Sequence, residues 1–186
     1  MTTIIRSPDE TAELAAARGG DRAAFARLVR AHHDQGLALA VRLLGNHEDA
    51  EDAMQEALIK TLRFLHRVEP ERGFRSWFLR IVFNQCLDAR RRRATRARHE
   101  HAAPPPDATV AGGEARARGR EGLARVRALL EMLPPKQAAA LHLRVFEEFD
   151  YARIGAVLGI TPGSARVYLV KARRALRAQL GEDWSP

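Results

Sequence analysis

The chain contains 186 residues, enough for one domain or two small ones, and its composition, 46% hydrophobic and 29% charged, is that of a globular protein rather than a fibrous or disordered one. Cys86 is the single cysteine, which excludes an intrachain disulfide and a cysteine-based zinc site, and no apolar run approaches the ~20 residues of a membrane-spanning helix. The 31 basic and 23 acidic residues give a net charge of +8, a weak indication of nucleic acid as a partner.

Three helices are predicted in the N-terminal half of the chain. Residues 1–20 form a polar, alanine-rich extension that has no signal-peptide layout and ends in two glycines. Asp21 is expected to cap a helix that ends at Gly45, and Gly36 could introduce an irregularity within it. Asn46 and Asp49 have the spacing of a capping box at the start of the second helix.

The second helix has one apolar and one acidic face. The apolar face is expected to pack in the core and carries Ala50, Ala53, Met54, Ala57, Leu58, Thr61, Leu62 and Leu65. The segment 46–71 holds seven acidic and three basic residues, a net charge of −4. A plain solvated face accounts for these acids as readily as a protein-docking surface does. Because acidic groups repel DNA phosphates, docking would require a second kind of partner.

The third helix is expected to begin near Phe74 and to end in the four consecutive arginines 90–93. The segment 72–101 around it holds nine basic and two acidic residues, a net charge of +7. Aromatic and basic side chains alternate along this helix, a pattern that suits single-stranded nucleic acid. A buried aromatic core with solvated arginines explains the same pattern equally well.

Residues 94–118 lose the helical periodicity and contain three consecutive prolines and a glycine pair, so a flexible linker is predicted there. Four helices are expected after it: one with leucines between 123 and 133, one that begins at Pro135, one at 151–158 capped by Asp150, and one from Pro162 to about residue 180. Strand-like alternation is absent from the sequence. The predicted fold class is therefore all-α, with two small helical domains joined by a flexible linker.

The segment 150–169 has the features of a helix-turn-helix. Gly159 permits a left-handed turn, Thr161 can cap the second helix and Pro162 can begin it. The outward face of that helix suits the major groove of DNA and carries Arg166, Val170, Lys171, Arg173 and Arg174. An αα-hairpin with a solvated basic face is the alternative, but cap, turn and charge together favour DNA binding.

Four segments together resemble the extracytoplasmic-function (ECF) sigma factors of bacterial RNA polymerase, in the sigma-70 family. Residues 21–25 are similar to the start of the family's region 2. Residues 49–56, D-A-E-D-A-M-Q-E, match its D-A-E-D-x-x-Q-E stretch, and residues 74–84 resemble its F-x-x-W-L-x-R-I-x-x-N pattern. Residues 133–137, followed by the helix-turn-helix, resemble region 4. The order and spacing of all four segments carry the resemblance.

The resemblance implies a sigma factor that binds core RNA polymerase, directs it to specific promoters and assists DNA opening for transcription initiation. The implied domains are an N-terminal extension at 1–20, sigma region 2 at 21–93, the flexible linker at 94–118, sigma region 4 at 119–181 and a tail at 182–186. Because such a protein performs no bond chemistry itself, no catalytic residue, metal site or cofactor is expected.

The family's region 2 docks on the clamp helices of the largest polymerase subunit, then reads and melts the −10 element. The implied polymerase-binding residues are Asp49, Asp52, Gln55 and Glu56. The implied −10 DNA-binding residues are Arg72, Phe74, Arg75, Ser76, Trp77, Arg80, Asn84, Arg91 and Arg92.

The family's region 4 reads the duplex −35 element and contacts the polymerase flap. The implied −35 DNA-binding residues are Arg144, Thr161, Ser164, Arg166, Val167, Val170, Lys171, Arg173 and Arg174. Four positions depart from the family's habit: Arg153, Gly155, Val167 and Tyr168. Val167 offers base edges only apolar contact, such as with a thymine methyl group. Gly155, where alanine is common, is expected to weaken its helix by up to about 1 kcal/mol.

The implied partners are core RNA polymerase, promoter DNA in duplex and melted form, and an anti-sigma factor. The implied location is the cytoplasm, without membrane insertion, although a membrane-bound anti-sigma factor could hold the protein at the membrane.

Two other classes of protein compete with this interpretation. A conventional two-domain transcriptional regulator explains the helix-turn-helix but not the acidic helix next to the aromatic-basic one.

An enzyme is the second competing class. The pairs His32-His33 and His99-x-His101 are its candidate bases or ligands, but no carboxylate pair or nucleophile converges with them in the sequence. Cys86 is expected to be a small packing residue rather than a redox sensor.

Overall fold

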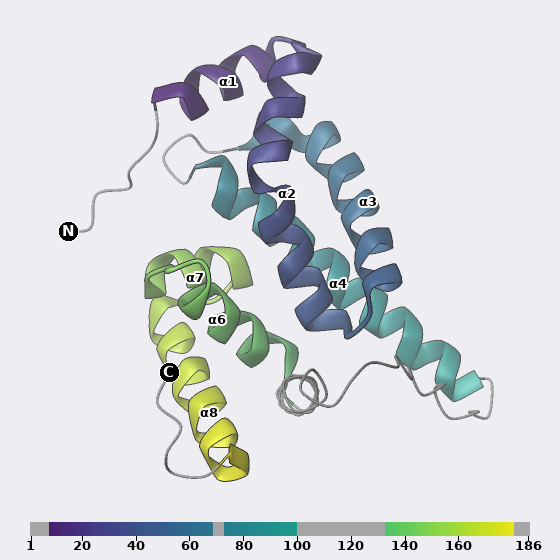
Figure 1. The fold of residues 1–186 in the computed structure, drawn as a ribbon, viewed down its shortest axis with the longest axis vertical. Helices are drawn as coiled ribbons and strands as arrows, with labels where there is room; N and C mark the ends of the chain where they lie inside the picture. The colour runs from purple at the N-terminus through teal and green to yellow at the C-terminus, as the bar shows by residue number, and fades with distance from the viewer. Residues whose placement is uncertain (1–7, 69–72, 100–132, 181–186) are drawn as a thin grey trace, which may run out of the picture.

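The computed structural model of the chain describes residues 8–68, 73–99 and 133–180, and this part of the chain consists of helices and short connections without strands (Figure 1). The predicted all-α class is therefore confirmed. The elements are α1 (Pro8–Arg18), α2 (Arg22–Leu44), α3 (His47–Phe64), the short 3₁₀ helix η1 (Leu65–Arg67), α4 (Phe74–His99), α6 (Pro135–Val145), α7 (Tyr151–Leu158) and α8 (Pro162–Leu180). No helix in the described ranges is both long and apolar enough to cross a membrane.

The three long helices α2, α3 and α4 form the N-terminal domain, and α1 packs across one end of α2 (Figure 1). Gly36 lies inside α2, where the helix continues without the irregularity expected from the sequence. A Cβ atom at Gly36 would lie 3.0 Å from Phe78 and 3.1 Å from the Met54 sulfur. Glycine at this position therefore lets the three helices approach one another closely.

Local caps set the ends of these helices as predicted. The Asp21 carboxylate accepts hydrogen bonds from the backbone N–H groups of Ala23 and Ala24, at 2.8 and 3.1 Å. Gly45 ends α2 in the left-handed conformation, with φ 82°. Asn46 Oδ1 accepts from the Asp49 N–H at 2.7 Å, and its amide donates to the Asp49 carboxylate at 2.7 Å. These polar side chains satisfy backbone groups that a helix end leaves unpaired.

Two helical segments extend beyond the sequence prediction. Residues 8–18 of the N-terminal extension form α1, which buries Leu14 and Ala17. Helix α4 continues to His99, so residues 94–99, which we expected in the linker, are helical. The sequence holds no glycine or proline between the arginine run and Pro104, and nothing there stops a helix. The remaining linker residues lie outside the described part of the chain.

Helices α6, α7 and α8 form the C-terminal domain, and α7 and α8 make the predicted helix-turn-helix. Asp150 caps α7 by accepting from the Arg153 N–H at 2.8 Å, and Thr161 caps α8 by accepting from the Ser164 N–H at 3.1 Å. Gly159 between the helices has φ 64°, as the turn requires. The first helix predicted for this domain lies, apart from Leu133, outside the described residues.

The expected effect of Gly155 needs correction. A Cβ atom there would lie 2.7 Å from the backbone oxygen of Ile160, whose N–H donates to the Gly155 carbonyl at 3.0 Å. The glycine does not merely weaken α7, because it permits the close return of the chain in the turn.

The two domains contact each other directly. Helix α7 packs against α4, and α6 packs against α2 (Figure 1). This arrangement covers part of the aromatic-basic helix with the first helix of the helix-turn-helix.

Candidate functional site

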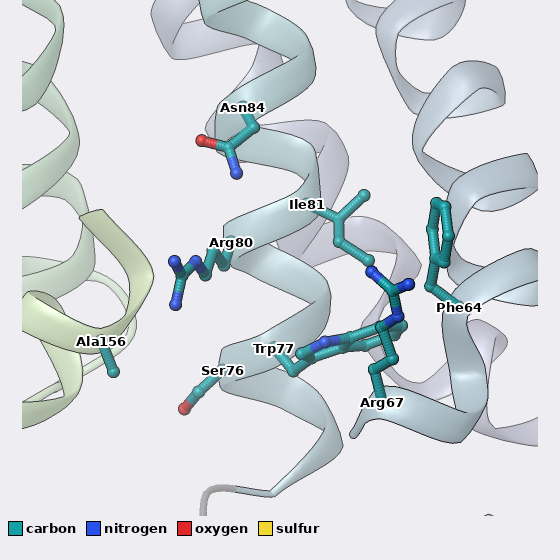
Figure 2. A pocket seen from close by; sticks show the side chains of 8 residues that line it. All are labelled: Phe64, Arg67, Ser76, Trp77, Arg80, Ile81, Asn84 and Ala156. Atoms are coloured by element: carbon teal, nitrogen blue, oxygen red, sulfur yellow. The ribbon is translucent and has the colours of Figure 1, made fainter. Parts of the chain in front are cut away.

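A half-open cavity of about 280 Å³ lies where α3, η1, α4 and α7 meet. Its lining side chains are Phe64, Arg67, Ser76, Trp77, Arg80, Ile81, Asn84 and Ala156 (Figure 2). Four of them, Ser76, Trp77, Arg80 and Asn84, belong to the residues that the sequence predicted for −10 binding. Their spacing along α4 puts them on one helix face, so the structure brings them to one site.

The cavity has an aromatic side and a polar side. Figure 2 shows the Trp77 ring beside Arg67 and Phe64, whereas Ser76, Arg80 and Asn84 point toward α7. The Arg67 guanidinium lies 4.7 Å from the centre of the Phe64 ring. Aromatic rings and guanidinium planes stack on unpaired bases, and hydroxyl and amide groups bond base edges. Arg67 could not be recognised from the sequence, because it precedes the motif at residues 74–84 and becomes a neighbour of Trp77 only through the fold.

Arg75, another predicted DNA-binding residue, is engaged within the protein. Its Nη2 forms an ion pair with the carboxylate of Glu147 in the C-terminal domain. Its Nε donates to Gln35 Oε1 at 3.1 Å, and its guanidinium lies 4.7 Å from the ring centre of Phe149. The side chain of Glu147 is 5% exposed and that of Arg75 is 30% exposed. A charge pair with a buried carboxylate and a partly exposed guanidinium thus joins the two domains.

The charge of Glu147 is stabilised by its surroundings. His142 is buried, and its Nε2 lies 3.6 Å from the Glu147 carboxylate. The His142 imidazole makes the largest contribution to lowering the pKa of Glu147, and Arg75 lowers it further, whereas burial acts in the opposite direction. Glu147 is therefore ionised at neutral pH. The sequence analysis did not single out Glu147 or His142.

The other residues predicted to bind the −10 element lie apart from the cavity. Phe74 is fully buried and stacks on Phe78 with 5.8 Å between ring centres, so its side chain supports α4 from inside. Arg91 and Arg92 are exposed near the far end of α4, where Arg91 pairs with Asp88 at 3.2 Å. Arg72 lies outside the described residues.

The predicted polymerase-binding residues share one face of α3. Asp52, Gln55 and Glu56 are exposed, whereas Asp49 is half-buried and lies 3.6 Å from Arg93. Leu62, which we expected in the core, is instead 60% exposed, and Ile59 is 63% exposed. Helical spacing places both on the side of the acidic residues, away from the buried positions of α3, which are Ala50, Ala53, Met54, Ala57 and Thr61. Exposed apolar groups beside acids are typical of a protein-docking surface.

Helix α8 presents its predicted recognition face to solvent. Val167 and Val170 are 49% and 60% exposed, whereas Leu169 is buried. Thr161 is exposed and Ser164 half-buried at the start of the helix. Arg144 of α6 donates to the Phe149 carbonyl at 3.0 Å. This bond holds the Arg144 guanidinium beside the connection between α6 and α7. The exposed basic residues are Arg166, Lys171, Arg173 and Arg174.

Of the histidines of the enzyme alternative, His32 and His33 have structural neighbours, whereas the His99 side chain and His101 lie outside the described part of the chain. His32 lies 3.1 Å from Gln35 Oε1 and packs on the Phe74 ring, and His33 lies 3.2 Å from Asp34. Across residues 8–68, 73–99 and 133–180, no group of three or more His, Cys, Asp or Glu side chains is arranged to hold a metal ion.

Comparison with known proteins identifies both domains. The "Sigma-70 region 2" family matches residues 28–96, and the "Sigma-70, region 4" family matches residues 123–176. The chain is 33% identical over 177 residues to the ECF RNA polymerase sigma factor SigM of Mycobacterium tuberculosis, covering 95% of this chain and 87% of SigM. It is 37% identical over 173 residues to the ECF sigma factor SigE of Mycolicibacterium smegmatis, covering 89% of this chain and 66% of SigE.

A solved structure has a similar fold. CnrH, in complex with the cytosolic domain of CnrY, superposes with a TM-score of 0.69 at 28% sequence identity, covering 95% of this chain and 99% of CnrH. The two family matches occur in the order region 2 then region 4, as the sequence motifs and the helix-turn-helix predicted. The relatives and the shared fold agree with this order. The chain therefore belongs to the extracytoplasmic-function RNA polymerase sigma factors of the sigma-70 family.

Proposed function

We propose that this sigma factor docks on core RNA polymerase through the exposed face of α3 and reads promoters with two surfaces, the cavity on α4 and the outer face of α8. The observation that carries this proposal is the convergence of Trp77, Arg80 and Asn84 with Phe64 and Arg67 on one cavity. A cavity with aromatic, guanidinium and amide groups suits an unpaired base better than a base pair.

The cavity receives a base of the −10 element after it leaves the duplex. Stacking on Trp77 and bonding by Asn84 offset the unstacking of that base, which costs roughly a few kcal/mol. DNA opening then follows from differential affinity, because the cavity binds the single strand and not the duplex. Arg91 and Arg92, exposed on the same helix, contact the phosphates of that strand.

Helix α8 enters the major groove of the −35 element. Val167 and Val170 supply apolar contacts, of which a thymine methyl group is the matching base feature. The flanking cations are suited to phosphates and to guanine edges: Arg144, Arg166, Lys171, Arg173 and Arg174. Thr161 and Ser164, at the start of α8, approach the sugar-phosphate backbone.

Promoter binding requires the two domains to separate. Ala156 of α7 contributes to the wall of the cavity, and Glu147 holds Arg75, so the C-terminal domain and DNA compete for the same face of α4. The described arrangement is the form of the protein before it binds a promoter. Attachment to polymerase, which acts in the cytoplasm, shifts the protein toward the separated form.

A protein inhibitor is a further expected partner. CnrH, 28% identical to this chain, was solved in complex with the cytosolic domain of another protein, CnrY. We extend this likeness to the present chain as the expectation of a partner of the anti-sigma class.

Reversing the charge of Asp52 and Glu56 to lysine tests the docking face. Both carboxylates are exposed, so the double variant is expected to fold normally but to lose co-purification with core polymerase. Asp34→Lys is the control, because Asp34 is fully exposed on α2 and is not part of the α3 face. Equal recovery of polymerase with the double variant and the control would refute the assignment of this face.

A further inference from the structure

Helix α1 lies before the region 2 family match, which begins at residue 28. It nevertheless forms hydrogen bonds to both chain segments that build the cavity. One segment is the end of α3 with η1, which supplies Phe64 and Arg67, and the other is the start of α4, which supplies Ser76 and Trp77. Residues 69–72, which connect these segments in the sequence, are outside the described part.

Arg18, the last residue of α1, binds the first segment. Its guanidinium donates to the carbonyl oxygens of Leu65 and His66, both at 3.4 Å, and to that of Val68. The Leu65 carbonyl also accepts from the Val68 N–H at 3.2 Å, and a cation is favourable beside the carbonyl groups of a helix end. The bonded carbonyls flank Arg67, so Arg18 fixes the backbone that carries this wall of the cavity.

Glu10, in the first turns of α1, binds the second segment. Its Oε1 accepts from the backbone N–H of Phe74 at 3.0 Å, at the first residue of α4. A carboxylate is favourable at a helix N-terminus because the helix dipole is positive there, just as a cation is favourable at the negative C-terminal end. Trp77 follows Phe74 by about one helical turn, so Glu10 fixes the start of the opposite wall.

Helix α1 is itself attached to the domain independently of these bonds. Leu14 and Ala17 are buried in the core, and this burial anchors α1 to the rest of the domain. The Glu10 and Arg18 side chains therefore extend from a fixed helix. The two segments they hold are linked to each other through α1 as well as through the intervening chain.

We infer that α1 sets the spacing between the two walls of the cavity, and that Glu10 and Arg18 are positioning residues for selection of the −10 base. This inference rests on the proposed function of the cavity. Without either side chain, water can satisfy the freed backbone groups, so the domain stays folded. The distance between Arg67 and Trp77 then varies, and the cavity accepts wrong bases more readily.

The test compares Arg18→Met and Glu10→Ala with two matched controls, Arg27→Met and Glu13→Ala. The controls remove the same kinds of side chain from an exposed ion pair between α1 and α2, in which Arg27 is 54% and Glu13 27% exposed. Each full-length variant is assembled with core polymerase. The probe is a pool of duplex templates randomised over the −10 element, with the −35 element held constant, and the runoff transcripts are sequenced.

The expected result is a loss of base discrimination. A wrong base pair normally costs on the order of tenfold or more in such sites, and this preference should fall at least about threefold in Arg18→Met and Glu10→Ala. The two controls should keep the wild-type preference. Glu10→Gln retains an Oε1 acceptor for Phe74 and should restore most of the discrimination. Polymerase affinity and the thermal midpoint are measured for every variant.

Unchanged base preference in Arg18→Met and Glu10→Ala would overturn the inference. An equal loss of transcription from every template, in step with a lower thermal midpoint, would also overturn it, because α1 would then serve stability alone. Absence of promoter-dependent transcripts with the wild-type chain and both controls would overturn the proposed function itself, and the inference with it.

Discussion

Arg75 of α4 and Glu147, which follows α6, form an ion pair that joins the two domains of this sigma factor. The two residues are 72 positions apart in the sequence. Gln35 and Phe149 contact Arg75, and His142 contacts Glu147. Arg75 also belongs to the helix proposed to read the −10 element. One side chain thus has two competing partners, a carboxylate of its own chain and promoter DNA.

Glu147→Gln is expected to shift the free protein toward separated domains. Losing one partner of a buried charge pair costs roughly 1–3 kcal/mol, since the remaining Arg75 charge is left partly desolvated. Small-angle X-ray scattering should report a larger radius of gyration, and circular dichroism should report unchanged helix content. Glu148→Gln is the control because Glu148 is exposed and next in sequence. A scattering profile for Glu147→Gln identical to that of the control would contradict the role of the pair.

The same contact has a defined pH dependence. Because the pKa of Glu147 in the folded protein is lowered from its ordinary value of 4.5, its carboxylate stabilises the contact fully above that value. The stabilisation is lost as the pH falls through the lowered pKa. For the wild-type protein, scattering should therefore show the same compact form throughout the neutral range. Glu147→Gln has no carboxylate to titrate at this position, so its radius of gyration at pH 7 should equal its radius of gyration in weak acid.

Asn84→Ala is expected to impair promoter opening more than promoter binding. Asn84 lines the cavity, where its amide can form a hydrogen bond to a flipped base. In the proposed mechanism this bond forms only after the base leaves the duplex, so binding of the closed duplex does not use it. One hydrogen bond of about 1 kcal/mol predicts a several-fold decrease in permanganate reactivity of −10 thymines. Closed-complex formation in a low-temperature gel shift should be unchanged. Thr95→Ala, an exposed change farther along α4, serves as control, and equal losses in both assays would argue against the cavity as the base site.

Lys171→Ala is expected to weaken binding of the polymerase holoenzyme to a −35 duplex. Lys171 is exposed on α8, and removing one phosphate contact reduces the salt dependence of the binding constant by about one unit of slope. Titrations at several salt concentrations measure this slope. Lys60→Ala on α3 removes the same charge far from α8 and should leave it unchanged. An unaltered slope for Lys171→Ala would show that a different face of α8 meets the DNA.

Cys86 is expected to be inert in the folded protein. The thiol is fully buried, and burial raises its pKa to about 12, although its own backbone and Arg90 act in the opposite direction. At pH 8 the reactive thiolate is therefore absent. A disulfide reagent such as dithionitrobenzoate should leave the native protein unmodified for hours and react at once after guanidinium is added. Rapid stoichiometric reaction of the native protein would mean that the site opens readily.

Helix boundaries could be predicted from the sequence because the signals that set them are local. Asp150, Gly159 and Pro162 act on backbone groups within a few residues, and the helices at both sides begin and end where these residues require. The end of α4 was missed because no local signal stops it before His99.

Long-range contacts could not be predicted in the same way. Among residues 10–18 of α1, whose burial is described, Leu14 and Ala17 are the buried ones, so the sequence has little amphipathic pattern. The bonds of α1 to the two cavity segments are made by Glu10 and Arg18, whose bonding partners lie 47 to 64 residues away. Arg75 likewise has the same sequence signature whether its partner is DNA or Glu147, and only the fold shows the second partner.

Runoff transcription with core RNA polymerase, the purified chain and a pool of promoter templates tests promoter-directed initiation most directly. We expect transcripts that depend on the chain and arise from templates sharing one −35 and one −10 element. The Asp52→Lys, Glu56→Lys double variant should abolish them, and Asp34→Lys on α2 should not. Initiation that is equally frequent on all templates, or that occurs at the same sites without the chain, would contradict this function.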